Sequence, residues 1–295
     1  MKTLSASAPT CVWDAGRLLG EGAWWSSQEH VLYWLDIKRP AIMRFEPMAG
    51  SREEWPSPDL IGCFAPRRSG GFIGAFRSSI ATFELPSKGE PIAPRPVSVP
   101  RGHGTDDRFN DGKCHPDGSF WAGTMDDREM DRTGFFYRLE PTLELERKSG
   151  PHTVCNGPAF SPDGRHAYLT DSAAQTVFRL DCETGDLEPF VQFGDGEGYP
   201  DGMTTDTDGR LWIAFWDGWA VRCISPQGEV ELEIDMPVAR PTSCAFGGEN
   251  LTTLFVTSAS IGLSEDERSN QPLAGGLFAC DIDGAQGWET PAFAG

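Results

Sequence analysis

The sequence contains an internal repeat of about 45 residues, and this repeat limits the possible folds more than any other feature. Three clear copies begin at Asn110, Asn156 and Asp201. Each copy has a short apolar run, an Asp-Gly pair, a second run of alternating apolar and polar residues, a polar turn and a third run. A fixed period of this length is typical of β-propellers and solenoids. The chain is therefore predicted to form an array of similar units.

The Asp-Gly pairs indicate that each unit is a β-meander. They stand at the same place in each copy, at Asp117-Gly118, Asp163-Gly164 and Asp208-Gly209. An Asp-Gly pair between two alternating runs is the strongest short-range signal for a β-hairpin. No long stretch has the 3.6-residue period of an amphipathic helix. These features favour an all-β fold over an α/β fold, which needs helices between its strands.

Three weaker copies raise the number of units to six, and they begin at Glu21, Ile61 and Thr242. We therefore predict one six-bladed β-propeller with four-stranded antiparallel blades over residues 1–295. An additional strand is predicted within residues 11–19, ahead of the first copy. We expect this strand to pair with the last blade and close the ring, since closure protects exposed strand edges. Residues 1–10 are expected to form a short flexible N-terminus.

The charge of the chain excludes several classes of partner. Its 44 acidic and 25 basic side chains give a formal net charge of −19. Nucleic acids and anionic membranes are bound through clustered Lys and Arg, so we expect neither partner. No signal peptide or membrane-spanning run is recognisable, which predicts a cytoplasmic protein. The eight cysteines are scattered without paired spacing, which indicates reduced thiols. No feature indicates an obligate protein partner.

Alignment of the six copies on their hairpin turns brings a set of polar residues to one repeat position. That position holds a carboxylate or an amide in four copies, at Glu21, Asn110, Asn156 and Asp201. It holds Ile61 and Thr242 in the other two copies. The first strand of every propeller blade lines the central channel. We therefore expect the four polar side chains to converge on the axis.

Two carboxylates and two amides around one axis predict a bound divalent cation, because buried charges need a partner or a metal. Oxygen ligands suit Ca²⁺, Mg²⁺ and Mn²⁺, and Zn²⁺ and Fe²⁺ also accept carboxylates. The simpler alternative is that Asn and Asp before Gly are ordinary turn formers. Their matched positions in three copies, with Glu21 in a fourth, favour the metal. The alignment does not separate metal ligands from substrate contacts.

Other common sites are not indicated by the sequence. The five histidines lack ligand spacing such as H-x-x-x-H, so a histidine-based zinc site is not expected. No G-x-S-x-G, P-loop or G-x-G-x-x-G segment occurs, which argues against the usual serine hydrolases and nucleotide-binding proteins.

Six segments of the chain form a familiar series, namely LGEGAWW, RFNDGK, WAGTM, CNGPAFSPDG, YPDGMTTDTDGRLWIA and TSCAFGG. In this order they resemble the SMP-30/gluconolactonase/regucalcin family of sugar lactonases, and especially bacterial aldonolactonases such as xylonolactonase. The resemblance spans nearly the whole chain. It implies a metal-dependent hydrolase that converts an aldonolactone to the aldonic acid in bacterial pentose or hexose oxidation.

The resemblance also implies roles for individual residues. Glu21, Asn156 and Asp201 correspond to the metal ligands of the family. Arg108 and Asn110 are expected to face the substrate above the metal. A metal would polarise the lactone carbonyl and present a water. We expect Asp201 to act as general base as well as ligand, and Arg108 and Asn110 to donate hydrogen bonds to the carbonyl or the ring hydroxyls.

The chain departs from the family at one place that bears on substrate choice. Family members often carry a Glu three residues after the Met of the GTM segment, where it contacts sugar hydroxyls. This chain has Arg128 there, between Asp127 and Glu129. A different set of polar groups predicts a different sugar size or stereochemistry.

Two alternative functions remain open from the sequence. A metal on a propeller axis polarises P=O as well as C=O, so a phosphotriesterase-like hydrolase fits the same scaffold. A non-catalytic propeller that binds a divalent metal is the second alternative.

Overall fold

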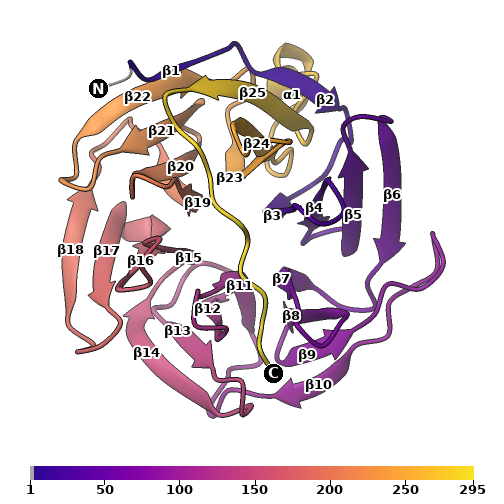
Figure 1. The fold of residues 1–295 in the computed structure, drawn as a ribbon, viewed down its shortest axis with the longest axis vertical. Helices are drawn as coiled ribbons and strands as arrows, with labels where there is room; N and C mark the ends of the chain where they lie inside the picture. The colour runs from indigo at the N-terminus through magenta and orange to yellow at the C-terminus, as the bar shows by residue number, and fades with distance from the viewer. Residues whose placement is uncertain (1–2) are drawn as a thin grey trace.

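The computed structural model describes residues 3–295 and contains six antiparallel sheets arranged as blades around a central axis (Figure 1). The predicted six-bladed propeller is confirmed. Blade 1 consists of β3 (Gly20–Ser26), β4 (Val31–Asp36), β5 (Ala41–Glu46) and β6 (Ser51–Pro56). Blade 2 consists of β7 (Ile61–Pro66), β8 (Phe72–Phe76), β9 (Ile80–Phe83) and β10 (Arg95–Ser98). Blade 3 consists of β11 (Asp107–Cys114), β12 (Phe120–Asp126), β13 (Gly134–Leu139) and β14 (Leu145–His152).

The second half of the chain repeats this plan. Blade 4 consists of β15 (Cys155–Phe160), β16 (His166–Asp171), β17 (Thr176–Asp181) and β18 (Leu187–Gln192). Blade 5 consists of β19 (Tyr199–Thr205), β20 (Leu211–Trp216), β21 (Ala220–Ile224) and β22 (Val230–Asp235). Blade 6 contains β23 (Pro241–Gly247), β24 (Thr253–Ser258) and β25 (Leu277–Asp283). The first strand of each blade lies nearest the axis (Figure 1).

The N-terminal residues complete the sixth blade. Strands β1 (Ser5–Ala6) and β2 (Thr10–Trp13) both pair antiparallel with β25. The predicted closure by an N-terminal strand is therefore confirmed. The stretch expected to be flexible includes β1, whose Ser5 pairs with Asp283, so this part is held in the sheet. Residues 1 and 2 lie outside the described residues.

Helices play a small part in the fold. The described residues contain one α-helix, α1 (Glu265–Asn270), and one 3₁₀ turn, η1 (Ser172–Ala174). Ser264 caps α1 and forms a reciprocal capping box with Glu267. Over residues 3–295, no helix has the length and apolar character needed to cross a membrane.

The hydrophobic core lies between neighbouring blades. Trp34, Trp121 and Trp212 each lie on the second strand of their blade and are fully buried. Aromatic and β-branched residues on the pleated strand surfaces bury large areas against the next blade. The ring closure uses the same packing, because Trp13 of β2 meets Trp34 of blade 1 edge to face with 5.4 Å between ring centroids.

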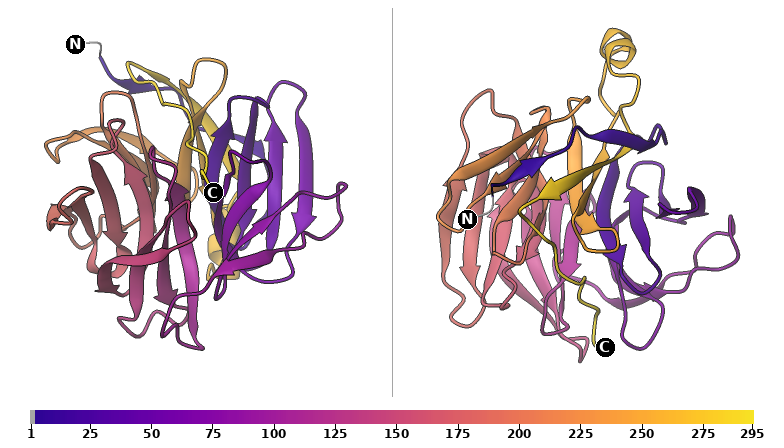
Figure 2. Two further views of the ribbon diagram at one scale, coloured as in Figure 1. Left: turned by 60° about the horizontal axis from the view of Figure 1, so that its bottom comes forward. Right: turned by 45° about the horizontal axis from the view of Figure 1, so that its top comes forward.

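The C-terminal residues 284–295 cross one end of the central channel (Figures 1 and 2). The indole nitrogen of Trp288 donates to Thr205 Oγ1 of blade 5 at 2.9 Å, and Thr290 Oγ1 donates to the Trp25 carbonyl of blade 1 at 3.0 Å. Phe293 is fully buried and forms a bridge to Arg67 after β7. The segment therefore joins blades that lie on different sides of the axis.

Candidate metal centre and active site

A cavity of about 670 Å³ opens at the beginnings of the inner strands. Its volume is within the range of small-molecule sites. The lining residues come from every blade except the second, and they are Leu19, Glu21, Lys38, Arg108, Asn110, Met125, Glu129, Val154, Asn156, Ser172, Ala173, Tyr199, Asp201, Trp216, Arg240, Ile261 and Gly262.

The four polar residues selected by the repeat alignment all line this cavity. Glu21, Asn110, Asn156 and Asp201 are each at most 5% exposed. The remaining two aligned positions do not line it: Ile61 is fully buried in the core, and the hydroxyl of Thr242 donates to the Gly20 carbonyl. Arg108, singled out from the family resemblance, also lines the cavity.

A local irregularity accompanies these side chains in every blade. Each inner strand loses its regular pairing with the second strand near its start, between Glu21/Trp24, Ile61/Cys63, Phe109/Gly112, Asn156/Ala159, Pro200/Met203 and Pro241/Ser243. A β-bulge bends the strand and re-aims a side chain, and bulges often stand beside active sites. The Gly after the aligned residue has positive φ at Gly22 and Gly157, where a side chain would be strained.

Glu21 and Asp201, the two buried carboxylates of the cavity, form no ion pair with a basic side chain among the described residues. Burial, followed by the charges of Asp201 and Asp111, raises the pKa of Glu21 well above its usual value. Burial and the charge of Asp111 raise the pKa of Asp201 in the same way. Oδ1 of Asp201 is buried and has no hydrogen-bond partner among the described residues. Such a group is costly to bury unless a cation binds it.

The donor set fits a hard divalent cation. Within residues 3–295, no three His, Cys, Asp or Glu side chains gather as a metal cluster. The candidate set consists of two carboxylates, Glu21 and Asp201, with the amide oxygen of Asn156. Oxygen donors of this kind suit Ca²⁺, Mg²⁺ or Mn²⁺, and three protein ligands leave further coordination positions open. The unpartnered Asp201 oxygen is the structural feature that supports the fit.

Arg108 and Asn110 belong to one hydrogen-bond network. Arg108 Nη1 donates to Asn110 Oδ1 at 2.6 Å and to the Phe109 carbonyl at 3.1 Å. Asn110 Nδ2 donates to Asn156 Oδ1 at 2.8 Å and to the Cys155 carbonyl at 2.9 Å. Both hydrogens of the Asn110 amide are thus used within the protein. Nη2 of Arg108 has no protein acceptor among the described residues.

The three consecutive residues Asp127, Arg128 and Glu129 have different surroundings. Asp127 Oδ1 accepts hydrogen bonds from Arg108 Nε at 2.5 Å and from Lys38 Nζ at 2.6 Å. Arg128 is 60% exposed and pairs with acidic neighbours outside the cavity. Glu129, with φ of 59°, lines the cavity. Arg128 stands at the sequence position of the family's hydroxyl-contacting Glu but does not line the cavity. The carboxylate of Glu129, one residue later, does.

One wall of the cavity was not predicted from the sequence. It consists of Tyr199, Trp216 and Arg240, with the Arg240 guanidinium carbon 4.6 Å from the Trp216 ring centroid. Asp217 Oδ1 accepts a hydrogen bond from Arg240 Nε at 2.6 Å. Tyr199 and Arg240 stand two residues before the aligned positions, as Arg108 does, so the repeat alignment held a signal for both. Trp216, at the end of β20, has no such signal.

A buried group outside the cavity has the residue types of a serine hydrolase. Ser149 Oγ lies 2.7 Å from His152 Nε2, and His152 Nδ1 lies 3.6 Å from Asp171 Oδ2. All three side chains are buried, and none lines the cavity. The Asp171 carboxylate accepts backbone hydrogen bonds from Thr153 and Val154. The group therefore has a structural role at the start of β15.

The chain is similar along most of its length to known proteins. The SMP-30/Gluconolactonase/LRE-like region matches residues 19–260. The 6-deoxy-6-sulfogluconolactonase of Pseudomonas putida is 37% identical, over 97% of this chain and 98% of that protein. The L-arabinolactonase of Azospirillum brasilense is 36% identical, over 98% of this chain and 97% of that protein.

A solved structure shows the same fold. The calcium-binding protein regucalcin from Agrobacterium tumefaciens superposes with a TM-score of 0.91 and 22% identity, covering 98% of this chain and 97% of that chain. The family match runs from the start of blade 1 into blade 6 and ends before β25, and the residues that line the cavity begin where that match begins. The chain belongs to the SMP-30/gluconolactonase/LRE-like family.

Proposed function

We propose that this protein hydrolyses a sugar lactone to the aldonic acid with the help of one divalent cation. The observation that carries the proposal is the pair of buried carboxylates, Glu21 and Asp201, with the Asn156 amide in one cavity of small-molecule size. Membership of the family and the two lactonase relatives support a lactone as substrate. Glu21, Asn156 and Asp201 are the proposed metal ligands.

A cation held by these residues would supply Lewis-acid polarisation of the lactone carbonyl and would stabilise charge on its oxygen. Asp201 has a second proposed role as general base, because a carboxylate beside the attacking water can accept its proton as the new bond forms. Arg108 donates through Nη2 to a lactone oxygen, and Arg stays charged at any working pH.

Asn110 receives a narrower role than the sequence suggested. Its two amide hydrogens are held by Asn156 and the Cys155 carbonyl, and its Oδ1 accepts from Arg108. It retains a lone pair for a substrate hydroxyl but no free donor for a carbonyl. We therefore propose that Asn110 orients Arg108 and Asn156 and accepts a hydrogen bond from the sugar.

The charge of the cavity supports an uncharged aldonolactone as substrate. Lys38 and Arg108 share Asp127, and Arg240 is paired with Asp217. Glu129 adds a negative charge at the rim. Each basic side chain that lines the described cavity is therefore already paired with a carboxylate, and none remains to pair with a substrate sulfonate. We expect a neutral pentono- or hexonolactone to be preferred over a 6-sulfonated one.

The test is a panel of lactones assayed with protein stripped by a chelator and then supplied with Ca²⁺, Mg²⁺, Mn²⁺, Zn²⁺ or Fe²⁺. The panel contains xylono-, arabino-, galactono- and gluconolactone with the 6-sulfonated analogue, and acid release measures turnover. We expect activity only with added metal. Turnover in the stripped protein at the full rate would refute the role of the cation.

The same panel separates the alternatives. A phosphotriester with a coloured leaving group replaces the lactone in one arm, and its faster turnover would favour the phosphotriesterase-like reaction. Metal binding without turnover of any lactone or phosphotriester would instead favour a metal-binding propeller. Glu21→Gln serves as a matched variant, because it removes a ligand charge with little change in volume. Its activity should recover in part when the metal concentration is raised.

A further inference from the structure

The side-chain amide of Asn156 forms hydrogen bonds with buried groups through both its oxygen and its nitrogen. Its Oδ1 accepts from Asn110 Nδ2 at 2.8 Å, and its Nδ2 donates to Ser172 Oγ at 2.9 Å. Ser172 Oγ in turn donates to the Pro200 carbonyl at 2.6 Å. Asn156, Asn110 and Ser172 are 4%, 5% and 7% exposed, so water has little access to any of these bonds.

The direction of each hydrogen bond follows from the chemistry of its partner. A carbonyl oxygen only accepts, so the single hydroxyl proton of Ser172 is committed to Pro200. Ser172 Oγ is then an acceptor toward Asn156, and the NH₂ of the amide must face it. If the amide turned over, its oxygen would meet the Ser172 lone pairs and its NH₂ would meet the NH₂ of Asn110. Both buried contacts would be unpaired.

Ser172 is held in place independently of the cavity. It begins the 3₁₀ turn η1 (Ser172–Ala174), and its backbone N–H donates to the Val154 carbonyl at 3.0 Å. Pro200 lies in β19 of the next blade, so the Ser172 hydroxyl links blade 4 to blade 5 beside the two proposed ligands Asn156 and Asp201.

We propose that Ser172 is a positioning residue that selects the orientation of the Asn156 amide and so presents its oxygen to the cation. The inference rests on the proposed function, in which Asn156 is a metal ligand. Partners of this kind that orient a ligand commonly change metal affinity when they are removed. The repeat alignment did not indicate Ser172, because its role depends on a contact between blades.

The first experiment is calorimetric titration of the stripped full-length protein with CaCl₂ and with MnCl₂. Ser172→Ala should weaken binding roughly tenfold. Ser172→Thr keeps the hydroxyl and should restore binding to within about threefold of wild type. Thr170→Val is the matched control: Thr170 is the cross-strand neighbour of Asn156, and its buried hydroxyl has no partner among the described residues. Its metal affinity should stay at the wild-type value.

The second experiment tests orientation directly by repeating Ser172→Ala in an Asn156→Asp background. A carboxylate presents two equivalent oxygens, so turning it over changes nothing for the metal. The effect of Ser172→Ala should therefore fall to less than about twofold there. Thermal melting of every variant without metal checks that the fold is kept.

The possible failures point to different errors. An equal loss of affinity from Ser172→Ala in both backgrounds would overturn the inference, since Ser172 would then act by packing. Wild-type affinity in Ser172→Ala, with a large loss in Asn156→Ala, would also overturn it while leaving the proposed ligand in place. Unchanged affinity in Asn156→Ala would instead show that the proposed metal ligands are wrong.

Discussion

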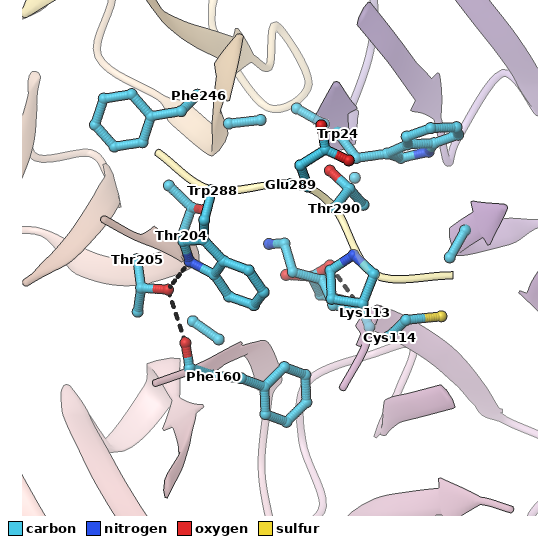
Figure 3. A pocket seen from close by; sticks show the side chains of 18 of the residues that line it. Trp24, Lys113, Cys114, Phe160, Thr204, Thr205, Phe246, Trp288, Glu289 and Thr290 are labelled. Atoms are coloured by element: carbon cyan, nitrogen blue, oxygen red, sulfur yellow. Dashed lines mark hydrogen bonds between the residues drawn. The ribbon is translucent and has the colours of Figure 1, made fainter. Parts of the chain in front are cut away.

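The two ends of the central channel are built from the same six inner strands but are finished in different ways. At the starts of the strands lies the open cavity of about 670 Å³ with its carboxylates and amides. At their other ends lies a cavity of only about 60 Å³, covered by the C-terminal segment (Figure 3). There Trp288 donates to Thr205, and Thr205 donates to the Phe160 carbonyl at 2.7 Å.

The open end holds the candidate site, whereas the covered end is closed by the C-terminal segment. At the covered end the polar atoms of Trp288 and Thr205 are paired, and Phe246 and Trp24 line the same cavity. At the open end Asp201 keeps an unpartnered buried oxygen, and the pKa values of both Glu21 and Asp201 are raised. One such carboxyl, Asp111, lines the covered cavity. Unfavourable burial of this kind is retained where function needs it and is offset by stability elsewhere. The comparison predicts opposite effects of substitutions at the two ends.

Asp201→Asn at the open end should have the largest effect. Lactone hydrolysis should fall by roughly 10³-fold, because a charged ligand and the proposed base are lost together. The metal-free protein should melt at a higher temperature, since one of two neighbouring buried carboxylates is gone. Steady-state kinetics in metal-rich buffer and thermal melts in chelator measure the two effects. Near wild-type turnover would show that Asp201 is not part of the reaction.

Phe293→Ala at the covered end should act in the opposite manner. Phe293 is fully buried, and its removal should lower the free energy of unfolding by about 3–5 kcal/mol. Lactone kcat/KM at 25 °C should remain close to wild type, because Phe293 does not line the open cavity. Urea unfolding and kinetics test both statements. Val99→Ala, at a position that is 59% exposed, is the control and should change stability by less than about 0.5 kcal/mol.

The covered end also carries a charged pair that predicts a pH dependence of stability. Burial acts to lower the pKa of His115, but hydrogen bonds to Asp117 and Cys182, the charge of Asp117 and the Gly164 carbonyl together outweigh it and raise the pKa to about 9. A raised histidine pKa stabilises the folded state fully below the unfolded value of about 6.5. This stabilisation is lost as the pH rises from about 6.5 through 9.

The measurement compares the unfolding free energies of wild type and His115→Gln between pH 6 and 9.5. Their difference should shrink by about 2 kcal/mol over this range, a value reduced for the solvent exposure of Asp117. A difference that stays constant with pH would mean that His115 is neutral in the folded protein throughout.

The smallest effects are expected at the rim of the open cavity. Glu129→Gln should raise KM for the lactone by about threefold to tenfold, because a hydroxyl acceptor in the cavity loses its charge. Arg128→Gln, one residue earlier, should leave KM within about twofold, because Arg128 is 60% exposed and pairs outside the cavity. A larger rise in KM for Arg128→Gln than for Glu129→Gln would show that residue 128, and not residue 129, contacts the substrate hydroxyl.

The sequence by itself determined the blade plan and the four convergent side chains. Glu21, Asn110, Asn156 and Asp201 occupy one repeat position, and repeated units around an axis bring equivalent residues together. The same repeat predicted the number of blades, and residues 11–19 indicated the strand that closes the ring. These features follow from local patterns that each unit carries within its own residues.

Only the tertiary structure decided how those side chains are held. The bonds of Asp127 to Lys38 and of Ser172 to Pro200 join different blades, and no period in the sequence encodes such pairs. The path of residues 284–295 across the channel is of the same kind, since this segment has no counterpart in the repeats. Contacts between distant units depend on the closed ring, which exists only after every blade has packed against its neighbours.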